Sequence, residues 1–330
     1  MRDAPRYDLY AIGNALVDIL IPVDDTFIQT NELAKGTMAL ADAARSRTLY
    51  ERAGAAAEMA SGGSAANTLA GFASLGGGAG RCAFAGKIGR DQFGEAFAHD
   101  LRAQNIHFAG SPLPGLPTGH CLSFVTPDAQ RTMVTHLGAA GEFSTADIDA
   151  DIVRQSAAIY LEGYMFATPA TKQSFHKASQ IAHQAGRKVA LTLSDIFCVR
   201  GHREDFAALI RDEVDILFAN EHELMELYRA ENLESAIAAA RAHVDIAVTT
   251  RSEKGAVIAA SDQMIATPAH PPTSLVDSTG AGDLYAAGFL FGLSQGKDFA
   301  TCAHIGAVAA AEVISHYGAR PLIPLSELVK

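Results

Sequence analysis

The run DSTGAGD at residues 277–283 combines residue types that suit the transfer of a phosphoryl group. Glycine at 280 and 282 lets the backbone take unusual angles and come close to a ligand. Because a helical pattern begins at Asp283, we expect the backbone N–H groups of Gly280, Ala281 and Gly282 to form an anion site. The Asp283 carboxylate beside it could accept the proton of an attacking hydroxyl. The alternative is a structural loop in which Asp283 is a first-turn residue favoured by the helix dipole.

The helix dipole also creates a tension for Asp283 as a base. The positive end of a helix lowers the pKa of a nearby carboxyl group and weakens it as a proton acceptor. A loose transition state for phosphoryl transfer demands little base strength, so correct placement can suffice. The prediction of a catalytic role for Asp283 therefore rests on its position rather than on its basicity.

Two further runs carry groups that suit a sugar. In SGGSAAN, Gly62 and Gly63 offer backbone amides to a sugar oxygen, and the Asn67 amide can both donate and accept. In GNALVD, the Asp18 carboxylate can accept from two neighbouring hydroxyls at once. The alternatives are structural, with Ser64 as the N-cap of a helix and Asp18 as a polar strand residue that faces water.

The run NEHE places Asn220 and Glu223 directly after a predicted strand. With Asn220 as N-cap and Glu223 three positions later, the two side chains form an asparagine version of the capping box. The same pair could also lie near phosphate and magnesium-bound water. The structural role and the functional role do not exclude each other.

One other motif match fails on its context, and two further motifs are absent or incomplete. The run GAGRCA at 78–83 fits GxGxxA, but it precedes a predicted strand, whereas a dinucleotide-binding loop must follow one. The sequence contains no GxxxxGK[ST] run, and His222-Glu223 lacks the second histidine of an HExxH zinc motif. The histidines show no ligand spacing. The 4 cysteines are scattered without a CxxC pair, which is typical of buried thiols in a reducing compartment.

The composition narrows the class of partner. The 330 residues include 26 Lys and Arg against 37 Asp and Glu, which gives a net charge of −11. This acidic balance argues against nucleic acid and membrane surfaces, because both require clustered basic side chains. The N-terminus has no apolar signal segment, and no apolar run reaches the roughly 18 residues of a membrane span. A cytoplasmic protein with a small-molecule substrate is therefore expected.

The elements that must position these groups alternate between strands and helices. Short apolar runs predict strands at 7–13, 81–89, 157–163, 188–194, 214–220, 246–250 and 255–260. Amphipathic patterns predict helices at 64–76, 91–105, 171–186, 222–230 and 233–243, and Ala-rich patterns predict helices at 283–294 and 299–317. The alternation predicts an α/β fold whose mostly parallel sheet is covered on both faces.

Ligands of such sheets bind beyond the carboxyl ends of the strands. This rule nominates Asn14, Gly163, Tyr164, Ser194, Asp195, Asn220 and Thr250. Residues 14–50 and 108–140 do not fit the alternation, and the second segment is typical of a hairpin around Pro127-Asp128. We expect these two segments to form a small β lid over the ligand edge of the sheet.

The motifs GGSAAN, GKIGRDQFGE, NEHE and DSTGAGD occur in the order found in the ribokinase or PfkB family of sugar and nucleoside kinases, which the chain resembles over nearly its whole length. Within the family it is most similar to adenosine kinases, through GNALVDI, PTGHCLSF, DAQRTMVTHLGAAGEFS, LEGYMF and LTLSDIF. The resemblance implies a ribokinase-like three-layer sandwich with a small β-sheet lid, in one domain over residues 1–330. It also implies ATP-dependent phosphorylation of a hydroxymethyl group on a ribose-bearing substrate, adenosine first, in purine salvage.

The same resemblance implies roles for individual residues. Asp283 would be the base, Gly280, Ala281 and Gly282 the anion hole, and Arg131 the lid cation that closes over the phosphates. The residues implied to hold the acceptor are Asn14, Asp18, Gly62, Gly63 and Asn67 around the ribose, and Leu40, Met133, Tyr164 and Phe166 against the base. Those implied to serve ATP are Asn220, Glu223, Thr250, Gly255 and Thr279, with Asn220 and Glu223 organising magnesium through water. A potassium ion, where one binds, would lie near the backbone of Asp277, Thr279 and Gly318.

One departure from the family pattern concerns ATP. Many relatives carry a TxGxxG-like run where this chain has Ser252, so the resemblance leaves the ATP contact beside Thr250 open. Two alternatives to a nucleoside kinase stand beside it: a kinase of ribose, fructose or another free sugar, and a nucleotide- or sugar-sensing protein without turnover. The expected assembly is a monomer or a homodimer.

Overall fold

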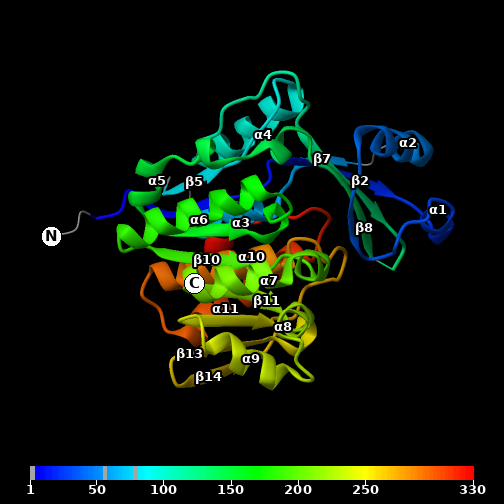
Figure 1. The fold of residues 1–330 in the computed structure, drawn as a ribbon. Helices are drawn as coiled ribbons and strands as arrows, with labels where there is room; N and C mark the ends of the chain where they lie inside the picture. The colour runs from blue at the N-terminus through cyan, green and yellow to red at the C-terminus, as the bar shows by residue number, and fades with distance from the viewer. Residues whose placement is uncertain (1–3, 55–57, 77–80, 129) are drawn as a thin grey trace.

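A computed structural model describes residues 4–54, 58–76, 81–128 and 130–330, and these residues form two β-sheets of unequal size (Figure 1). The strands of the larger sheet are β1 (Tyr7–Ile12), β5 (Cys82–Ala85), β6 (Ile106–Phe108), β9 (Ser156–Glu162), β10 (Lys188–Thr192), β11 (Ile216–Asn220), β12 (Ile246–Thr250), β13 (Ala256–Ala260) and β14 (Gln263–Thr267). Their order is β14-β13-β12-β11-β10-β9-β1-β5-β6. Neighbouring strands from β12 to β6 are parallel, and β13 and β14 are antiparallel to their neighbours.

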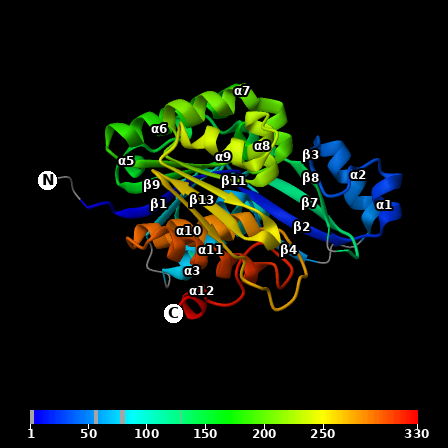
Figure 2. The same ribbon diagram turned by 90° about the horizontal axis from the view of Figure 1, so that it is seen from below.

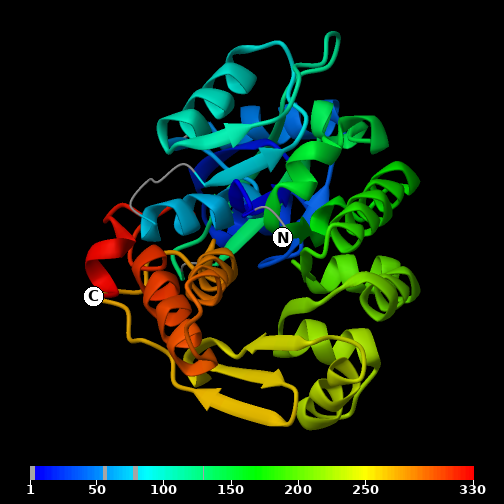
Figure 3. The same cartoon turned by 90° about the vertical axis from the view of Figure 1, so that its left-hand side faces the viewer.

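Helices cover both faces of the larger sheet (Figures 2 and 3). One face carries α3 (Ser64–Leu75), α4 (Gln92–Ala103), α10 (Ala281–Ser294) and α11 (Phe299–Val313), and the short α12 (Leu325–Leu328) lies against α3. The other face carries α5 (Ala150–Arg154), α6 (Pro169–Gln184), α7 (Ile196–Glu213), α8 (Glu221–Tyr228) and α9 (Leu233–Arg241). Within the described ranges, no helix has the length and apolar character needed to cross a membrane.

The alternation of side chains along β1 shows why its sequence is apolar from Leu9 to Ile12. Leu9 and Ala11 belong to the hydrophobic cluster beneath α3 and α10, whereas Tyr10 and Ile12 belong to the cluster beneath α6 and α7. Successive side chains of a strand point to opposite faces, so a strand covered on both faces has no polar position in its middle. The predicted α/β three-layer arrangement is confirmed.

The smaller sheet forms a lid, which projects to one side of the larger sheet (Figure 1). Its strands, in the order β3-β8-β7-β2-β4, are β2 (Leu16–Pro22), β3 (Met38–Leu40), β4 (Glu58–Ser61), β7 (Gly119–Val125) and β8 (Arg131–His136). The predicted hairpin is the antiparallel pair β7 and β8, and Ala129 in its turn lies outside the described residues. The predicted range 14–50 misses β4, which pairs with β2, and residue 108 belongs to the larger sheet. A strand as short as β4 carries too little alternation to be predicted from sequence.

The two faces of the lid sheet contact different parts of the protein. On the outer face, Ile19, Ile21, Leu122, Phe124 and Val134 form a separate hydrophobic cluster with residues of α1 (Asp25–Thr30) and α2 (Ala43–Ala53). The period of two along each strand then turns Asp18, Cys121, Met133 and Thr135 toward the larger sheet. Arg131 follows the same alternation as Met133, so its side chain also faces the larger sheet.

Helix α7 is the longest described element that the sequence patterns did not predict. Gly201 lies inside it, and His202 takes the non-helical angles φ −142° and ψ 31°, which divide the helix at a kink. A glycine followed by a backbone break interrupts the 3.6-residue period on which prediction of a helix depends.

Helices α10 and α11 approach so closely at Gly288 that a β-carbon added there would lie 2.6 Å from Cα of Gly306. We predict that Gly288→Ala lowers the free energy of unfolding by about 1–3 kcal/mol, because the obstructing atoms belong to backbone and cannot rotate away. The control is Gly201→Ala in α7, where no atom lies within 4 Å and no loss is expected. Denaturant unfolding measures both variants, and equal losses would contradict the prediction.

Candidate active site

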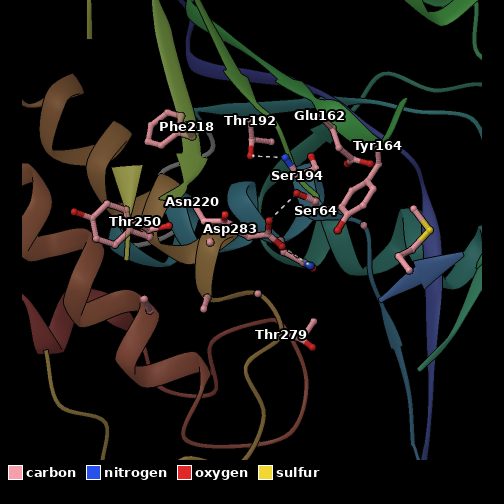
Figure 4. Close-up of a pocket in the computed structure, with 18 of the residues that line it drawn as sticks. Ser64, Glu162, Tyr164, Thr192, Ser194, Phe218, Asn220, Thr250, Thr279 and Asp283 are labelled. Carbon is pink, nitrogen blue, oxygen red and sulfur yellow. Dashed lines mark hydrogen bonds between the residues drawn. The ribbon is translucent and has the colours of Figure 1, made fainter. Parts of the chain in front are cut away.

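A cavity of about 460 Å³ lies between the carboxyl ends of the parallel strands and the inner face of the lid (Figure 4). Residues that follow or end successive strands line it: Asn14 after β1, Tyr164 after β9, Ser194 after β10, Asn220 in β11 and Thr250 in β12. The rule for parallel sheets predicted each of these positions. The other two nominated residues, Gly163 and Asp195, do not line the cavity.

Asp283 lies in the first turn of α10 and faces the cavity. The Ser64 hydroxyl donates to its Oδ1 at 2.6 Å, and Asn67 Nδ2 donates to its Oδ2 at 3.2 Å (Figure 4). Burial raises the pKa of the Asp283 carboxyl to about 6, and this effect outweighs the opposing effect of the two hydrogen bonds. The pKa of Asp283 is thus raised, whereas the helix dipole alone was expected to lower it. The carboxylate is still ionised at neutral pH.

The turn before Asp283 has the backbone geometry that its glycines allow. Gly280 has φ +78°, and a β-carbon added there would lie 2.9 Å from Ala319. Gly280, Ala281 and Gly282 all line the cavity, and nothing lies within 4 Å of an added β-carbon at Gly282. Ala281 N makes a long hydrogen bond to Ser278 O at 3.4 Å. Because the first N–H groups of a helix lack intrahelical acceptors, the turn still offers donors to an anion.

Asp18 lines the cavity from the lid strand β2. Burial raises the pKa of its carboxyl to about 6, although the charges of Arg131 and Arg320 act in the opposite direction. A β-carbon added at Gly62 would lie 2.3 Å from the Asp18 carboxylate, so only glycine leaves room for this side chain. The backbone N–H of Gly62 donates to Leu16 O at 2.8 Å. The prediction that this amide binds a sugar oxygen is therefore wrong, whereas Gly63 and Asn67 do line the cavity.

Glu162 is a cavity residue that the sequence analysis missed. Its carboxylate accepts from Asn14 N at 3.3 Å, Asn14 Nδ2 at 2.9 Å and Ala65 N at 2.8 Å. It thereby joins the ends of β1 and β9 to the start of α3, and burial raises the pKa of the Glu162 carboxyl to about 7. Glu162 could have been predicted from the sequence, because it is a carboxylate at the end of an apolar strand, at the ligand edge of the sheet.

The capping box of Asn220 and Glu223 is confirmed. Glu223 N donates to Asn220 Oδ1 at 2.9 Å, and Asn220 N donates to Glu223 Oε2 at 2.9 Å. Asn220 Nδ2 donates to Glu223 Oε1 at 2.7 Å, and burial raises the pKa of the Glu223 carboxyl to about 7. Both side chains line the cavity, and both carboxylate oxygens are occupied, which fits a contact with magnesium through water rather than direct ligation. In the described ranges no group of three His, Cys, Asp or Glu is placed to hold a metal ion.

The wall beyond Asn220 contains Thr250, Ser252, Gly255 and Thr279. Ser252 has φ +50°, a left-handed conformation that glycine adopts without strain and that costs other residues about 1 kcal/mol or more. Ser252 therefore holds a backbone conformation in which glycine would be less strained. The sequence analysis did not predict the rest of this end, which is formed by Phe218, Ala219, Ala269, His270, Tyr285, Ala307, Ala310, Ala311 and Ile314.

The resemblance implied that Arg131 closes over the phosphates, but Arg131 does not line the cavity. Its buried guanidinium forms an ion pair with Asp277, which is also buried. The Asp277 carboxylate also accepts from Thr279 N at 3.1 Å and Gly318 N at 3.0 Å. Arg131 therefore connects the lid to the base of the 280–282 turn. The carboxylate therefore has a cation and two backbone donors as partners. A potassium ion near the backbone of Asp277, Thr279 and Gly318 stays a prediction. Neither Asp277 nor Gly318 lines the cavity.

The prediction that Phe166 packs on a base is wrong. Phe166 is 1% exposed and stacks on Phe206, with ring centroids 4.4 Å apart, inside the core beneath α6 and α7. A 3₁₀ turn at Gly163–Met165 follows β9 and separates the directions of the two aromatic residues. Tyr164 lines the cavity, and Phe166 completes the core.

The inner face of the lid forms an apolar roof over one end of the cavity. The roof consists of Leu16, Met38, Leu40, Cys121, Met133, Thr135 and Leu137. Met38 and Met133 are partners in the pairing of β3 with β8, so their thioethers lie side by side. Leu40 and Met133 were predicted for this wall.

Comparison with known proteins adds a family and several close folds. A family model described as pfkB family carbohydrate kinase matches residues 39–325. The crystal structures of a probable sugar kinase protein from Rhizobium etli CFN 42 and of adenosine kinase from Sinorhizobium meliloti are 42% and 45% identical to this chain. Each match covers 98% of both chains with a TM-score of 0.94. Adenosine kinase from Saccharomyces cerevisiae is 26% identical over 69% of this chain and 70% of its own length.

The burial of Asp283 gives a prediction for stability. Its folded-state pKa of about 6 exceeds the ordinary 3.8, so this carboxyl group favours folding at low pH and opposes it increasingly between about pH 4 and 6. We predict that Asp283→Asn raises the free energy of unfolding at pH 8 by about 1–3 kcal/mol, with a smaller gain at pH 5. Denaturant unfolding at both pH values measures this. In the control Asp298→Asn, hydrogen bonds from Thr301 lower the pKa of the original carboxyl, so no gain at pH 8 is expected. An Asp283→Asn variant no more stable than the parent at pH 8 would refute the prediction.

Proposed function

The chain belongs to the pfkB family of carbohydrate kinases, and we propose that it transfers the γ-phosphoryl group of ATP to the 5′-hydroxymethyl group of a nucleoside, with adenosine as the first candidate. It is therefore a phosphotransferase that acts on a hydroxyl group. The finer proposal concerns the alcohol that the protein phosphorylates. We propose that the protein acts on a small molecule in cytoplasmic purine salvage. Its proposed assembly is a monomer or a homodimer.

The observation that carries the nucleoside proposal is the two-ended character of the cavity beneath the lid. Asp18, Asn67 and Asp283 form a polar end that suits the hydroxyls of ribose. The roof residues continue from it as an apolar surface, and Tyr164 stands beside Asp283 (Figure 4). A planar base gains contact with thioethers and an aromatic ring, whereas the hydroxyls of a free sugar would lose water there and find few polar partners beyond the Thr135 and Tyr164 hydroxyls.

Asp283 is the proposed base. At neutral pH its carboxylate is ionised and can accept the proton of the attacking alcohol, and a pKa of about 6 makes that transfer more favourable than an ordinary aspartate would. Ser64 and Asn67 hold one carboxylate oxygen each, and this defines the direction of the group. A positioned carboxylate of this kind contributes mainly by placing the alcohol in line with the phosphoryl group.

The proposed phosphate site is the start of α10. The backbone N–H groups of Gly280, Ala281 and Gly282 would stabilise charge on the transferring group. Thr250, Ser252, Gly255 and Thr279 line the adjoining wall and are the proposed contacts of ATP. Magnesium bound with the phosphates would neutralise part of their charge, and Asn220 and Glu223 would hold its water ligands. In Figure 4, Asn220 and Thr250 lie on one side of Asp283, and Ser64 and Tyr164 lie on the other.

Two alternatives concern the substrate and the turnover. A free-sugar kinase is the nearer one, because the Rhizobium etli relative is described as a probable sugar kinase. A sensor without turnover would bind nucleoside or ATP without releasing ADP. The buried Asp283 is costly to maintain, which favours a catalyst over a sensor.

We predict ADP release with adenosine and loss of that activity in Asp283→Ala by several orders of magnitude, with ATP binding largely retained. The assay is ADP release against a panel of nucleosides and free sugars, with and without potassium, and ATP binding is followed by calorimetry. The control is Asp298→Asn, at the exposed N-cap of α11. Faster turnover of a free sugar than of every nucleoside would refute the nucleoside proposal, and a variant rate within about tenfold of the parent would refute the role of Asp283.

We predict that Met133→Ser raises KM for the nucleoside about tenfold and leaves kcat within about twofold, because the roof contacts the base equally in the ground state and the transition state. The control is Met264→Ser on β14, which is 52% exposed and does not line the cavity. Steady-state kinetics with adenosine and with ribose measure both variants. An equal change of KM for adenosine and ribose would show that the roof does not contact a base.

A further inference from the structure

The backbone of the segment after α11 is held in place at several points beside the 280–282 turn. Gly318 N donates to Asp277 at 3.0 Å, and Ala319 lies against the Gly280 turn. Further along, Leu322 N and Ile323 N both donate to Glu312 Oε1, at 2.9 and 3.1 Å. The intervening residue, Arg320, is thus carried on a backbone held from both sides.

Arg320 extends from this segment toward α3. Its Nε donates to Asn67 Oδ1 at 3.5 Å, a long hydrogen bond of the kind that often tightens when substrate binds. Its Nη2 is buried and has no hydrogen-bond partner in the part of the chain that the structure describes. A buried donor without a partner costs stability, so packing alone does not account for an arginine here.

Asn67 stands between Arg320 and Asp283 and contacts them with opposite ends of its amide. Nδ2 donates to Asp283 Oδ2 at 3.2 Å, and Oδ1 accepts from Arg320 Nε. A guanidinium can only donate and a carboxylate can only accept, so only one orientation of the amide satisfies both neighbours. The reversed amide would set N–H against N–H at Arg320 and oxygen against oxygen at Asp283.

The surrounding charges also favour a cation at this position. Asp18 and Asp100 both attract the Arg320 guanidinium, and Asp100 in turn accepts from the Ser61 hydroxyl of β4. Arg320 therefore lies where the lid, α3 and α4 meet, and it contacts Asn67 at the polar end of the cavity without lining the cavity itself. Burial lowers the pKa of Arg320 to about 10, which leaves it charged at neutral pH.

We propose that Arg320 is a positioning residue for phosphoryl transfer, which sets the orientation of the Asn67 amide and through it the direction of the Asp283 carboxylate. The inference rests on the proposed role of Asp283 as the base, and it does not depend on which alcohol is the acceptor. No proton or phosphoryl group moves at Arg320. Its contribution is to hold the carboxylate in line with the alcohol.

A double-mutant cycle tests the proposal. Arg320→Met should lower kcat about tenfold with the best acceptor of the panel, with a smaller change in the KM for ATP. In an Asn67→Ala background the same substitution should lower kcat less than twofold, because the group through which Arg320 acts is gone. Arg154→Met on α5, where the arginine is exposed and paired with Asp151, is the matched control and should leave kcat unchanged in both backgrounds.

A merely structural role would reduce kcat by the same factor in both backgrounds, and that result would overturn the proposal. A kcat of Arg320→Met within twofold of the parent would also overturn it. Where Arg320→Met fails to fold, Arg320→Lys keeps the charge and the aliphatic stem, and it is read in the same cycle. The Tm of the parent, the two single variants and the double variant is also measured without substrate. The shifts in Tm of the single variants are expected not to add up to that of the double variant. If the parent protein released no ADP with any nucleoside, only the nucleoside proposal would be refuted. The coupling between Arg320 and Asn67 could still be measured with a sugar acceptor or from the Tm values.

Discussion

The burial of the Asp283 carboxylate is the constraint on which the arrangement of the site depends. A carboxylate removed from water is stable only where donors replace the water, and Ser64 and Asn67 of α3 supply them. Helix α3 must therefore begin beside the first turn of α10. The two helices pack so closely that a β-carbon at Gly71 would lie 2.4 Å from Leu284. The stability lost by burying the charge is coupled to the proposed catalytic role, because the same burial raises the pKa of the proposed base to about 6.

Much of the framework could be predicted because it depends on local pattern and strand direction. Apolar runs located the central strands, and parallel strands bring Asn14, Tyr164, Ser194 and Thr250 to one edge whatever the details of packing. The orientation of individual side chains depends on more. Tyr164 and Phe166 are two residues apart, yet the 3₁₀ turn between them sends one to the cavity and the other to the core.

Contacts between distant segments explain most of what the sequence did not reveal. Asn67 and Arg320 are 253 positions apart, and Asn14 and Glu162 are 148 positions apart, so no short motif contains either pair. The family resemblance implied that Arg131 closes over the phosphates. The structure pairs it with Asp277, because a buried carboxylate beside the turn is the nearest group that can neutralise it.

The path of the chain between the two sheets couples substrate contact to the mechanics of the lid. Four segments cross from one sheet to the other, between β1 and β2, β4 and α3, β6 and β7, and after β8, and any rotation of the lid must bend all of them. Asn14, Gly63 and Leu137 lie in three of these crossings and also line the cavity. The connections between the two sheets and the lining of the cavity thus share residues. A substitution at any of these three positions changes the shape of the cavity and the link between the sheets at the same time.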